Sequence, residues 1–411
     1  MTMAGPGALF FGEEERKQVL EVLEKGYLFR YGDKSAGNFL ARVWQFEQEL
    51  ARYLGVKHAL AVNSGTSALL TGLAALGIGP GDEVLVPGYT FIASISSVVF
   101  ARAVPVLCEI DESLTIDPQD VARKITSRTA AIMPVHMLGN PCALKPLLQL
   151  ARKYKLALIE DCAQACGGSY LGKRLGSYGD VGAFSFNIFK TITAGDGGAV
   201  VTSQTRVYER AFAFHDQGHR PLRQGVEIGR RPFFGLDFRM TELTGAVLLA
   251  QLGKLETILK VLREKKKLFR SLLVGNQHFT FRKLNDEAGE CATILSVIFH
   301  DAEKARRVAR KLNTTTVDHS GWHVYANMEQ LLKQLTVTPE KCPFTCPHYR
   351  KKVQYRKGML PRTEDILRRT INISIGISDR GLGAGFGITA TSPTSEIYRR
   401  AEEFLTVVNN T

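Results

Sequence analysis

The chain lacks a long uninterrupted hydrophobic run. Arg102 breaks the nearest candidate, short of the roughly 18 residues that a membrane-spanning helix needs. The opening stretch, Met1 to Gly7, lacks the basic leader and apolar centre of a signal peptide. Internal repeats and low-complexity segments are also missing from the sequence. We therefore expect a cytoplasmic protein that has no membrane partner.

Cysteine is too sparse and too scattered for a disulfide framework. The seven cysteines are an odd number, which is typical of reduced thiols in the cytosol. Cys342, Cys346 and His348 have a spacing that some zinc sites use. Two intervening prolines and the lack of a second ligand pair argue against a metal there, and we expect none.

Acidic residues are outnumbered, with 40 Asp and Glu against 53 Lys and Arg, which gives a formal charge of +13. The basic runs lean toward the C-terminal part and are mixed with acids, as on solvated helix faces. They also suit attraction of an anionic substrate, such as a phosphorylated or nucleotide-linked molecule. Nucleic-acid binding ranks last because no nucleic-acid motif accompanies the charge, and we expect no such partner.

Short apolar segments alternate with helical ones through the first half of the chain. This pattern predicts an α/β fold, with a large domain whose mainly parallel mixed sheet is covered by helices on both faces. The expected strands are His58–Val62, Glu83–Val86, Val104–Glu109, Thr129–Val135, Leu156–Glu160, Val181–Phe186 and Gly198–Thr202.

The remainder of the chain has a different pattern. A long helix is expected over Met240–Leu268, and a smaller C-terminal α+β domain follows it. Before that helix, His215–Pro232 is polar and unpatterned, which indicates a long loop that has a function or is ordered by a partner. The expected division is an N-terminal helical segment (1–45), a large cofactor-binding domain (46–270) and a small C-terminal domain (271–411).

Lys190 lies between an apolar run and a glycine-rich turn, and most such lysines are simply solvated. Asp161, at the end of an apolar strand about thirty residues upstream, changes this interpretation. A pyridoxal-phosphate site needs a lysine for the Schiff base and a carboxylate opposite the pyridinium nitrogen. Because a free lysine is protonated at neutral pH, such a site must lower the pKa of Lys190.

Further candidates follow other predicted strands. Gly65, Thr66 and Ser67 open a helix and suit a phosphate, although N-capping explains such hydroxyls equally well. Phe91, at the next strand-to-helix junction, can stack on a flat heterocycle or belong to the core. Gln164 can reach the ring's phenolic oxygen or only bond backbone, and Ser185 can supply another phosphate contact.

Taken together, these motifs resemble the DegT family of sugar and cyclitol aminotransferases, within the aspartate-aminotransferase-like fold. The resemblance runs from about Phe46 through Leu255 and more weakly beyond. The motifs that carry it are Asn63–Leu69, Gly81–Val84, Pro134–His136, Glu160–Ala165, Gly179–Phe186, Asp196–Gly198 and Phe238–Leu243.

The resemblance implies roles for these residues. Lys190 corresponds to the Schiff-base lysine and Asp161 to the pyridinium partner, with Phe91 stacking and Gln164 near the phenolic oxygen. Gly65, Thr66, Ser67 and Ser185 correspond to the phosphate cup. Family members are dimers in which an Asn usually reaches the neighbour's phosphate. Asp237 stands in that position here, and a carboxylate beside a phosphate is unfavourable unless it is turned away, protonated or paired with Arg239.

The function implied is a pyridoxal 5'-phosphate-dependent transaminase in amino sugar biosynthesis, working as a homodimer. It moves an amino group from glutamate or glutamine to a keto-sugar, with or without a linked nucleotide, or to a keto-cyclitol. One alternative is a sugar dehydratase with the same cofactor, but the best-known ones carry histidine in the place of Lys190. A non-catalytic regulatory homologue is the other alternative.

Overall fold

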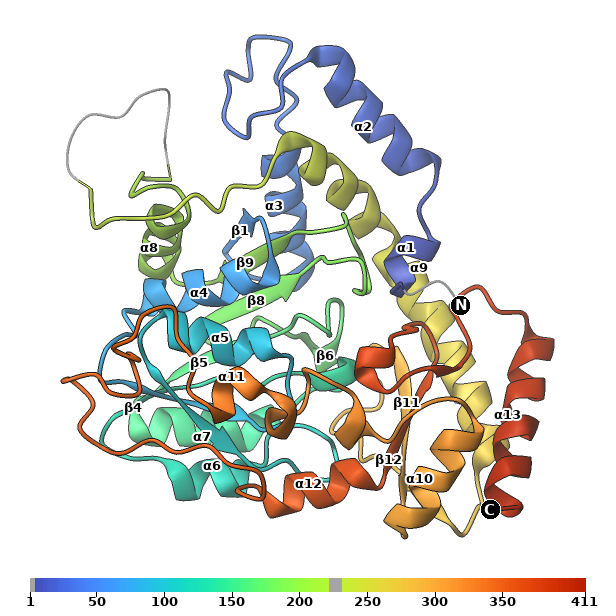
Figure 1. Cartoon of the computed structure of the whole chain (residues 1–411). Coiled ribbons are helices and arrows are strands. Elements are labelled where there is room, and N and C mark those ends of the chain that lie inside the picture. The colour runs from blue at the N-terminus through green and yellow to red at the C-terminus, as the bar shows by residue number, and fades with distance from the viewer. Residues whose placement is uncertain (1–3, 222–230) are drawn as a thin grey trace.

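The computed structural model describes residues 4–221 and 231–411. Its larger sheet has seven strands in the order β1-β9-β8-β5-β4-β2-β3 (Figure 1). Only β9 runs against its neighbours, so the predicted mainly parallel mixed sheet is confirmed. The strands are β1 (His58–Val62), β2 (Glu83–Pro87), β3 (Val104–Cys108), β4 (Thr129–Ile132), β5 (Ala157–Asp161), β8 (Val181–Ser185) and β9 (Gly198–Thr202).

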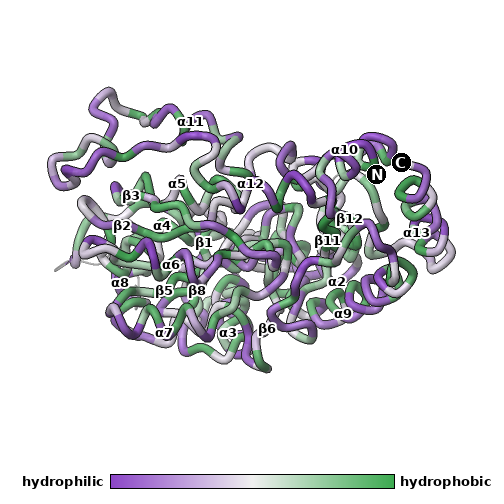
Figure 2. Tube along the Cα trace, turned by 90° about the horizontal axis from the view of Figure 1, so that it is seen from below, coloured by the Kyte–Doolittle hydropathy of each residue, from purple (hydrophilic) through white to green (hydrophobic). Residues whose placement is uncertain are grey.

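Helices cover both faces of this sheet, as predicted. Successive strand residues point to opposite faces, and β1 illustrates this, because Leu60 and Val62 belong to one core cluster while Ala59 and Ala61 belong to another. Figure 2 shows the hydrophobic residues gathered between the layers. One face carries α4 (Gly65–Leu76), α5 (Ile92–Phe100) and α8 (Thr205–His215). The other carries α3 (Arg42–Leu54), α6 (Pro118–Lys124) and α7 (Leu144–Tyr154).

A smaller second sheet has the order β10-β11-β12-β13 and confirms the predicted C-terminal α+β part. Its first three strands are antiparallel, and β13 pairs parallel with β12. The strands are β10 (Phe279–Phe281), β11 (Ile294–Phe299), β12 (Thr370–Ser374) and β13 (Phe386–Gly387). Around it lie α10 (Ala302–Lys311), α12 (Pro361–Arg368) and α13 (Thr394–Asn409).

The helix α9 (Glu242–Leu273) runs from the large sheet to the small one (Figure 1). It packs against α3, α13 and the N-terminal helix α2 (Glu13–Lys25). The expected domain boundary after residue 45 falls inside α3, and the boundary after residue 270 falls inside α9. Among the described residues, none of the helices combines the length and the apolar character needed to span a bilayer.

Candidate active site

A cavity of about 520 Å³ lies at the carboxyl ends of the large sheet's strands, where parallel α/β sheets bind ligands. One side, the strand-end wall, consists of Ser64–Thr66, Asp161, Gln164, Ser185 and their neighbours. The other side, the C-terminal wall, consists of residues 321–323 and 377–382. Lys190 and Phe91 also line the cavity. Of the predicted site residues, only Ser67 and Asp237 are missing from this lining.

Asp161 ends β5 and is buried, with 4% of its surface exposed. Its Oδ1 accepts the Ala163 N–H at 3.0 Å and its Oδ2 accepts the Ser94 hydroxyl at 2.7 Å. Burial raises the pKa of Asp161, while the Ser94 and Ala163 hydrogen bonds and the charge of Lys190 act in the opposite direction. In the described part of the chain, no Lys or Arg forms an ion pair with this carboxylate. The cavity therefore has a carboxylate that suits a cationic ring nitrogen.

Lys190 follows β8 in the glycine-rich turn and projects into the same cavity. Burial lowers the pKa of its ammonium, opposed by the negative charges of Asp161 and Asp379. A lowered lysine pKa increases the neutral fraction of the amine, which is the form that attacks a carbonyl carbon. The sequence predicted that a Schiff-base role would require a lowered pKa at Lys190, and the buried position of this lysine agrees with that requirement.

The N-terminus of α4 forms the predicted phosphate end of the cavity. Ser64 caps the helix by accepting the Ser67 N–H at 3.0 Å, and the Ser67 hydroxyl donates to Asn63 at 2.6 Å. Ser67 is thus used within the turn, and the cavity side consists of Gly65, Thr66 and Ser185. A Cβ on Gly65 would lie 2.6 Å from the Ser185 Cβ, so a glycine is needed for this close approach. Helix N–H groups and hydroxyls together suit a phosphate.

Gln164 is oriented by a turn that sequence reasoning did not identify. The Leu138 N–H donates to Gln164 Oε1 at 2.9 Å, which leaves the amide NH₂ as the end available to the cavity. The buried guanidinium of Arg282 donates to the carbonyls of Met137 and Leu138 at 3.2 and 3.1 Å. The predicted backbone bond of Gln164 is present, and Arg282 holds the turn that provides it.

Phe91 lies next to the C-terminal wall. The Phe91 ring, 39% exposed, lies 5.1 Å from the His323 ring. The Thr90 and Ile92 N–H groups donate to the carbonyls of His323 and Trp322, so the two segments run side by side. Phe91 is therefore in contact with the cavity rather than in the core. Tyr325, two residues beyond His323, is fully buried in the core instead.

The C-terminal wall contains two polar groups, His323 and Asp379. His323 Nδ1 lies 2.8 Å from the Gly381 carbonyl, so Nδ1 carries the hydrogen and Nε2 is bare. Burial and the charge of Lys190 lower the pKa of His323 to about 4, which keeps it neutral at physiological pH. Asp379 Oδ1 accepts the Gly381 N–H at 2.7 Å, and burial raises the pKa of this carboxyl. No sequence motif indicated Asp379.

The N-terminal segment, residues 4–10, packs directly on the lysine turn, although its sequence pattern indicated no function. The Gly5 N–H donates to the Ile188 carbonyl at 2.9 Å and the Gly7 N–H donates to the Lys190 carbonyl at 3.3 Å. A Cβ on Gly5 would meet the Phe189 carbonyl carbon at 2.2 Å. The Ala4 carbonyl accepts the Ser378 N–H, so this segment joins the lysine turn to the C-terminal wall.

Asp237 pairs with Arg239 at 2.5 Å, which is one of the arrangements that its sequence position suggested. Arg239 also pairs with the buried Asp216 at 2.6 Å. Of the predicted loop His215–Pro232, residues 222–230 lie outside the described residues. His215 itself ends α8 and is buried, so the loop begins later than expected.

His136, Glu160 and Cys162 form a buried cluster with donor atoms close enough for a metal ion. Two of the three side chains already bond the backbone, since Glu160 accepts the N–H groups of Gly176, Tyr178 and Gly179, and His136 Nδ1 accepts that of Cys142. His136 Nε2 lies 3.2 Å from Glu160. The cluster is satisfied as a structural network beneath Asp161 and needs no metal.

These features define an α/β protein whose cavity holds an amine, a buried carboxylate without an ion pair to any described Lys or Arg, a helix N-terminus that suits a phosphate, and an aromatic ring. Pyridoxal phosphate fits this set, because its cationic ring nitrogen suits the carboxylate at one end of the cavity and its anionic phosphate suits the helix N-terminus at the other. Residues 11–378 match the DegT/DnrJ/EryC1/StrS aminotransferase family, and the chain belongs to that family. It is a pyridoxal-phosphate-dependent aminotransferase.

The chain is similar to several known proteins. It is 40% identical over 265 residues to a GDP-perosamine synthase of Vibrio cholerae, covering 64% of this chain and 68% of that protein. It is 34% identical over 303 residues to a GDP-perosamine synthase of Escherichia coli O157:H7, covering 73% and 79%. The crystal structure of a 3-amino-5-hydroxybenzoic acid synthase superposes with a TM-score of 0.78 at 27% identity, covering 98% and 97%.

Proposed function

We propose that this enzyme transfers an amino group from glutamate or glutamine to a keto-sugar, which can be nucleotide-linked, or to a keto-cyclitol. One observation carries the proposal, namely that Lys190 and Asp161 line a single cavity with a phosphate-binding helix start. The names of its relatives support the acceptor class, since two of them are GDP-perosamine synthases. The net charge of +13 favours an anionic, nucleotide-linked acceptor.

We assign the cofactor contacts from the cavity lining. Asp161 would face the pyridinium nitrogen, Phe91 would cover the ring, and the Gln164 amide would lie near the phenolic oxygen. Gly65, Thr66 and Ser185 would hold the phosphate. When bound, pyridoxal phosphate supplies an electron sink, which makes the C–H bond of the amine-bearing carbon more acidic.

Lys190 is the group that we assign to proton transfer. Its lowered pKa provides a neutral amine that can remove the proton from the donor carbon in the donor half-reaction, and in the separate acceptor half-reaction its ammonium can give a proton to the acceptor carbon. The Ser94 hydroxyl donates to Asp161 and so favours its charged form, in which the carboxylate would fix the orientation of the site. Neutral His323 offers a bare Nε2 to a hydroxyl of the acceptor.

Three further assignments belong to this proposal. The enzyme works as a homodimer with shared active sites, in which Asp237 and Arg239 lie toward the neighbouring subunit. It acts in the cytoplasm. The division near residues 45 and 270 separates the cofactor-binding part from the smaller C-terminal part.

The test is transfer of labelled nitrogen. The enzyme is incubated with glutamate or glutamine carrying a heavy amino nitrogen and with a panel of keto-sugars, nucleotide-linked keto-sugars and keto-cyclitols. We expect a labelled amino product from at least one acceptor, detected by mass spectrometry. Water elimination without nitrogen transfer would instead support the dehydratase alternative, against which Lys190 argues. Absence of either reaction, with the cofactor bound, would leave the regulatory homologue.

A further inference from the structure

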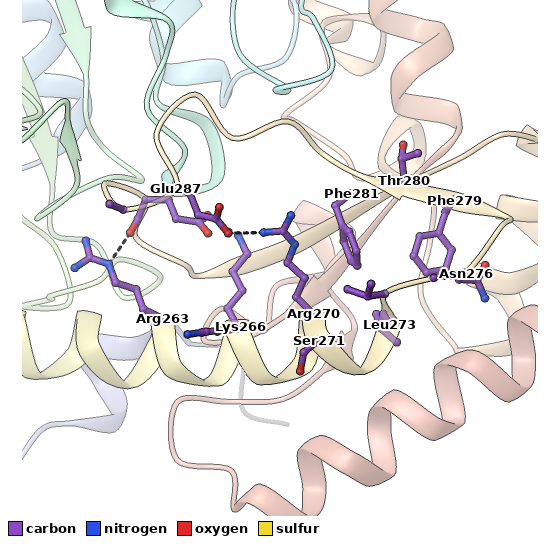
Figure 3. Close-up of a pocket in the computed structure, with 15 residues that line it drawn as sticks. Arg263, Lys266, Arg270, Ser271, Leu273, Asn276, Phe279, Thr280, Phe281 and Glu287 are labelled. Atoms are coloured by element: carbon purple, nitrogen blue, oxygen red, sulfur yellow. Dashed lines mark hydrogen bonds and ion pairs between the residues drawn. The ribbon is translucent and has the colours of Figure 1, made fainter.

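A second cavity, of about 700 Å³, lies beside the small sheet (Figure 3). It is enclosed by the C-terminal half of α9, by β10 and by the segment 287–290. In the described part of the chain, no residue lines both this cavity and the catalytic one. Its size lies within the range of small-molecule sites. We call it the α9 cavity.

Cations line one side of the α9 cavity. Arg263, Lys266, Lys267 and Arg270 are spaced at i, i+3, i+4 and i+7, which places all four on one face of α9. Only two carboxylates, Glu287 and Glu290, lie among the lining residues. The cavity therefore carries an excess of positive charge.

The two carboxylates already pair with two of the four α9 cations. Arg270 pairs with Glu287 at 2.5 Å, and the buried Lys266 pairs with Glu290. Arg263 donates its Nε to the Glu290 carbonyl at 2.9 Å, which leaves its terminal amino groups for another acceptor. Lys267 is exposed, and the described contacts give its ammonium no acid partner.

The electrostatics of Lys266 agree with an excess of positive charge. Its pKa is lowered to about 8, chiefly by burial, while Glu290 opposes this change and the charges of Arg282 and Arg270 add to it. Burial destabilises this ammonium most, and the guanidinium groups of Arg282 and Arg270 add a smaller repulsion. An anion in the α9 cavity would relieve that repulsion.

The opposite side of the α9 cavity is apolar. Leu273, Phe279 and Phe281 line it, and the two phenylalanine rings meet edge to face at 5.9 Å. The Arg270 guanidinium lies 5.1 Å from the centre of the Phe281 ring. Figure 3 shows the charged side chains of α9 and these rings along the same cavity. A ligand that fills it needs an anionic group at one end and a flat apolar body at the other.

We propose that the α9 cavity is a second ligand site, separate from the catalytic one, that binds a phosphate monoester of a flat ring. The phosphate lies against Arg263 and Lys267, because guanidinium groups bind phosphate oxygens through paired hydrogen bonds. The ring lies against Phe279, Phe281 and Leu273. Nothing in this assignment depends on the acceptor that the catalytic site uses.

The experiment is calorimetric titration of the holoenzyme with phenyl phosphate at low salt. The holoenzyme is used so that the catalytic phosphate end is already filled. We expect one binding event per chain, weakened about tenfold by Arg263→Gln and about threefold by Lys267→Gln. Lys260→Gln, on the same helix but outside the cavity lining, is the matched control and should change nothing.

Inorganic phosphate and phenol should each bind more weakly than phenyl phosphate, since each fills one end of the cavity only. Lys267 is exposed, so its replacement should not affect folding. The unfolding temperature of Arg263→Gln shows whether that variant is folded. Absence of phenyl phosphate binding would overturn the proposal. It would also be overturned if the two cavity variants and the control bound phenyl phosphate with equal affinity. Weakening by Ser185→Ala alone would place the probe in the catalytic cavity and overturn it too.

Discussion

The two walls of the catalytic cavity hold their carboxylates in different ways. On the strand-end wall, Asp161 is fixed by a backbone N–H and by the Ser94 hydroxyl, which in turn contacts Thr90 at 2.6 Å. On the C-terminal wall, one oxygen of Asp379 caps a short turn. The pKa of each carboxyl is raised by burial and lowered by Lys190. The difference suggests that Asp161 serves the constant cofactor and Asp379 serves the variable acceptor.

The largest effect is expected from Asp161→Asn. The amide keeps the shape but removes the charge that stabilises a protonated ring nitrogen, so turnover should fall about a hundredfold or more. Steady-state kinetics with saturating cofactor is the measurement. Asp161→Glu serves as the companion variant and should recover part of the lost rate. A fully active Asn variant would refute the assigned role.

A smaller loss, about tenfold in turnover, is expected from Gly5→Ala. The added methyl would collide with the Phe189 carbonyl carbon and displace the lysine turn. The absorbance spectrum of the holoenzyme should change together with the rate, because Lys190 moves. Gly253→Ala is the control, since a methyl there meets open space on α9. Equal behaviour of the two variants would show that the N-terminal segment does not position Lys190.

Asp379→Asn should separate the two walls. We expect the KM for the amino-acceptor substrate to rise about fivefold, because the variant loses a carboxylate that accepts hydrogen bonds from the hydroxyl groups of that substrate. Cofactor affinity and the donor half-reaction should stay unchanged. Measuring the two half-reactions separately provides the readout. If the donor half-reaction falls as far as in Asp161→Asn, the two walls do not differ in function.

Ser94→Ala should have the smallest effect, a few-fold loss near neutral pH. Its hydroxyl stabilises the charged form of Asp161, so removing it raises the pKa of that carboxyl. Because the charged form is the active one, the acidic limb of the pH–rate profile should move to higher pH. Ser97→Ala, one turn further along α5, is the control and should leave that limb in place. An unmoved limb in Ser94→Ala would contradict the link.

The same contrast between walls explains what the sequence could predict. Residues on the strand-end wall follow buried strands with clear periodicity, so β1 and β9 were predicted to the residue and Asp161 was placed at a strand end. Ser94 and Arg282 act through contacts with residues far away along the chain. No local pattern distinguishes them from ordinary polar residues.

The C-terminal wall depends on pairing between distant segments. Residues 321–324 join residues 89–92, and Ala4 joins Ser378, across hundreds of positions. Such contacts leave no period in the sequence, which is why Asp379 and the N-terminal segment were missed. The short elements β10 and α12 were missed because each spans too few residues to show an apolar repeat.

The central claim is that Lys190 is the residue to which the cofactor is covalently joined, opposite Asp161. The most direct measurement is borohydride treatment of the holoenzyme, followed by proteolysis and mass spectrometry of the labelled peptide. We predict that the added cofactor mass lies on Lys190 alone and disappears in Lys190→Arg. Labelling of another lysine, or unchanged labelling and turnover in Lys190→Arg, would contradict the account.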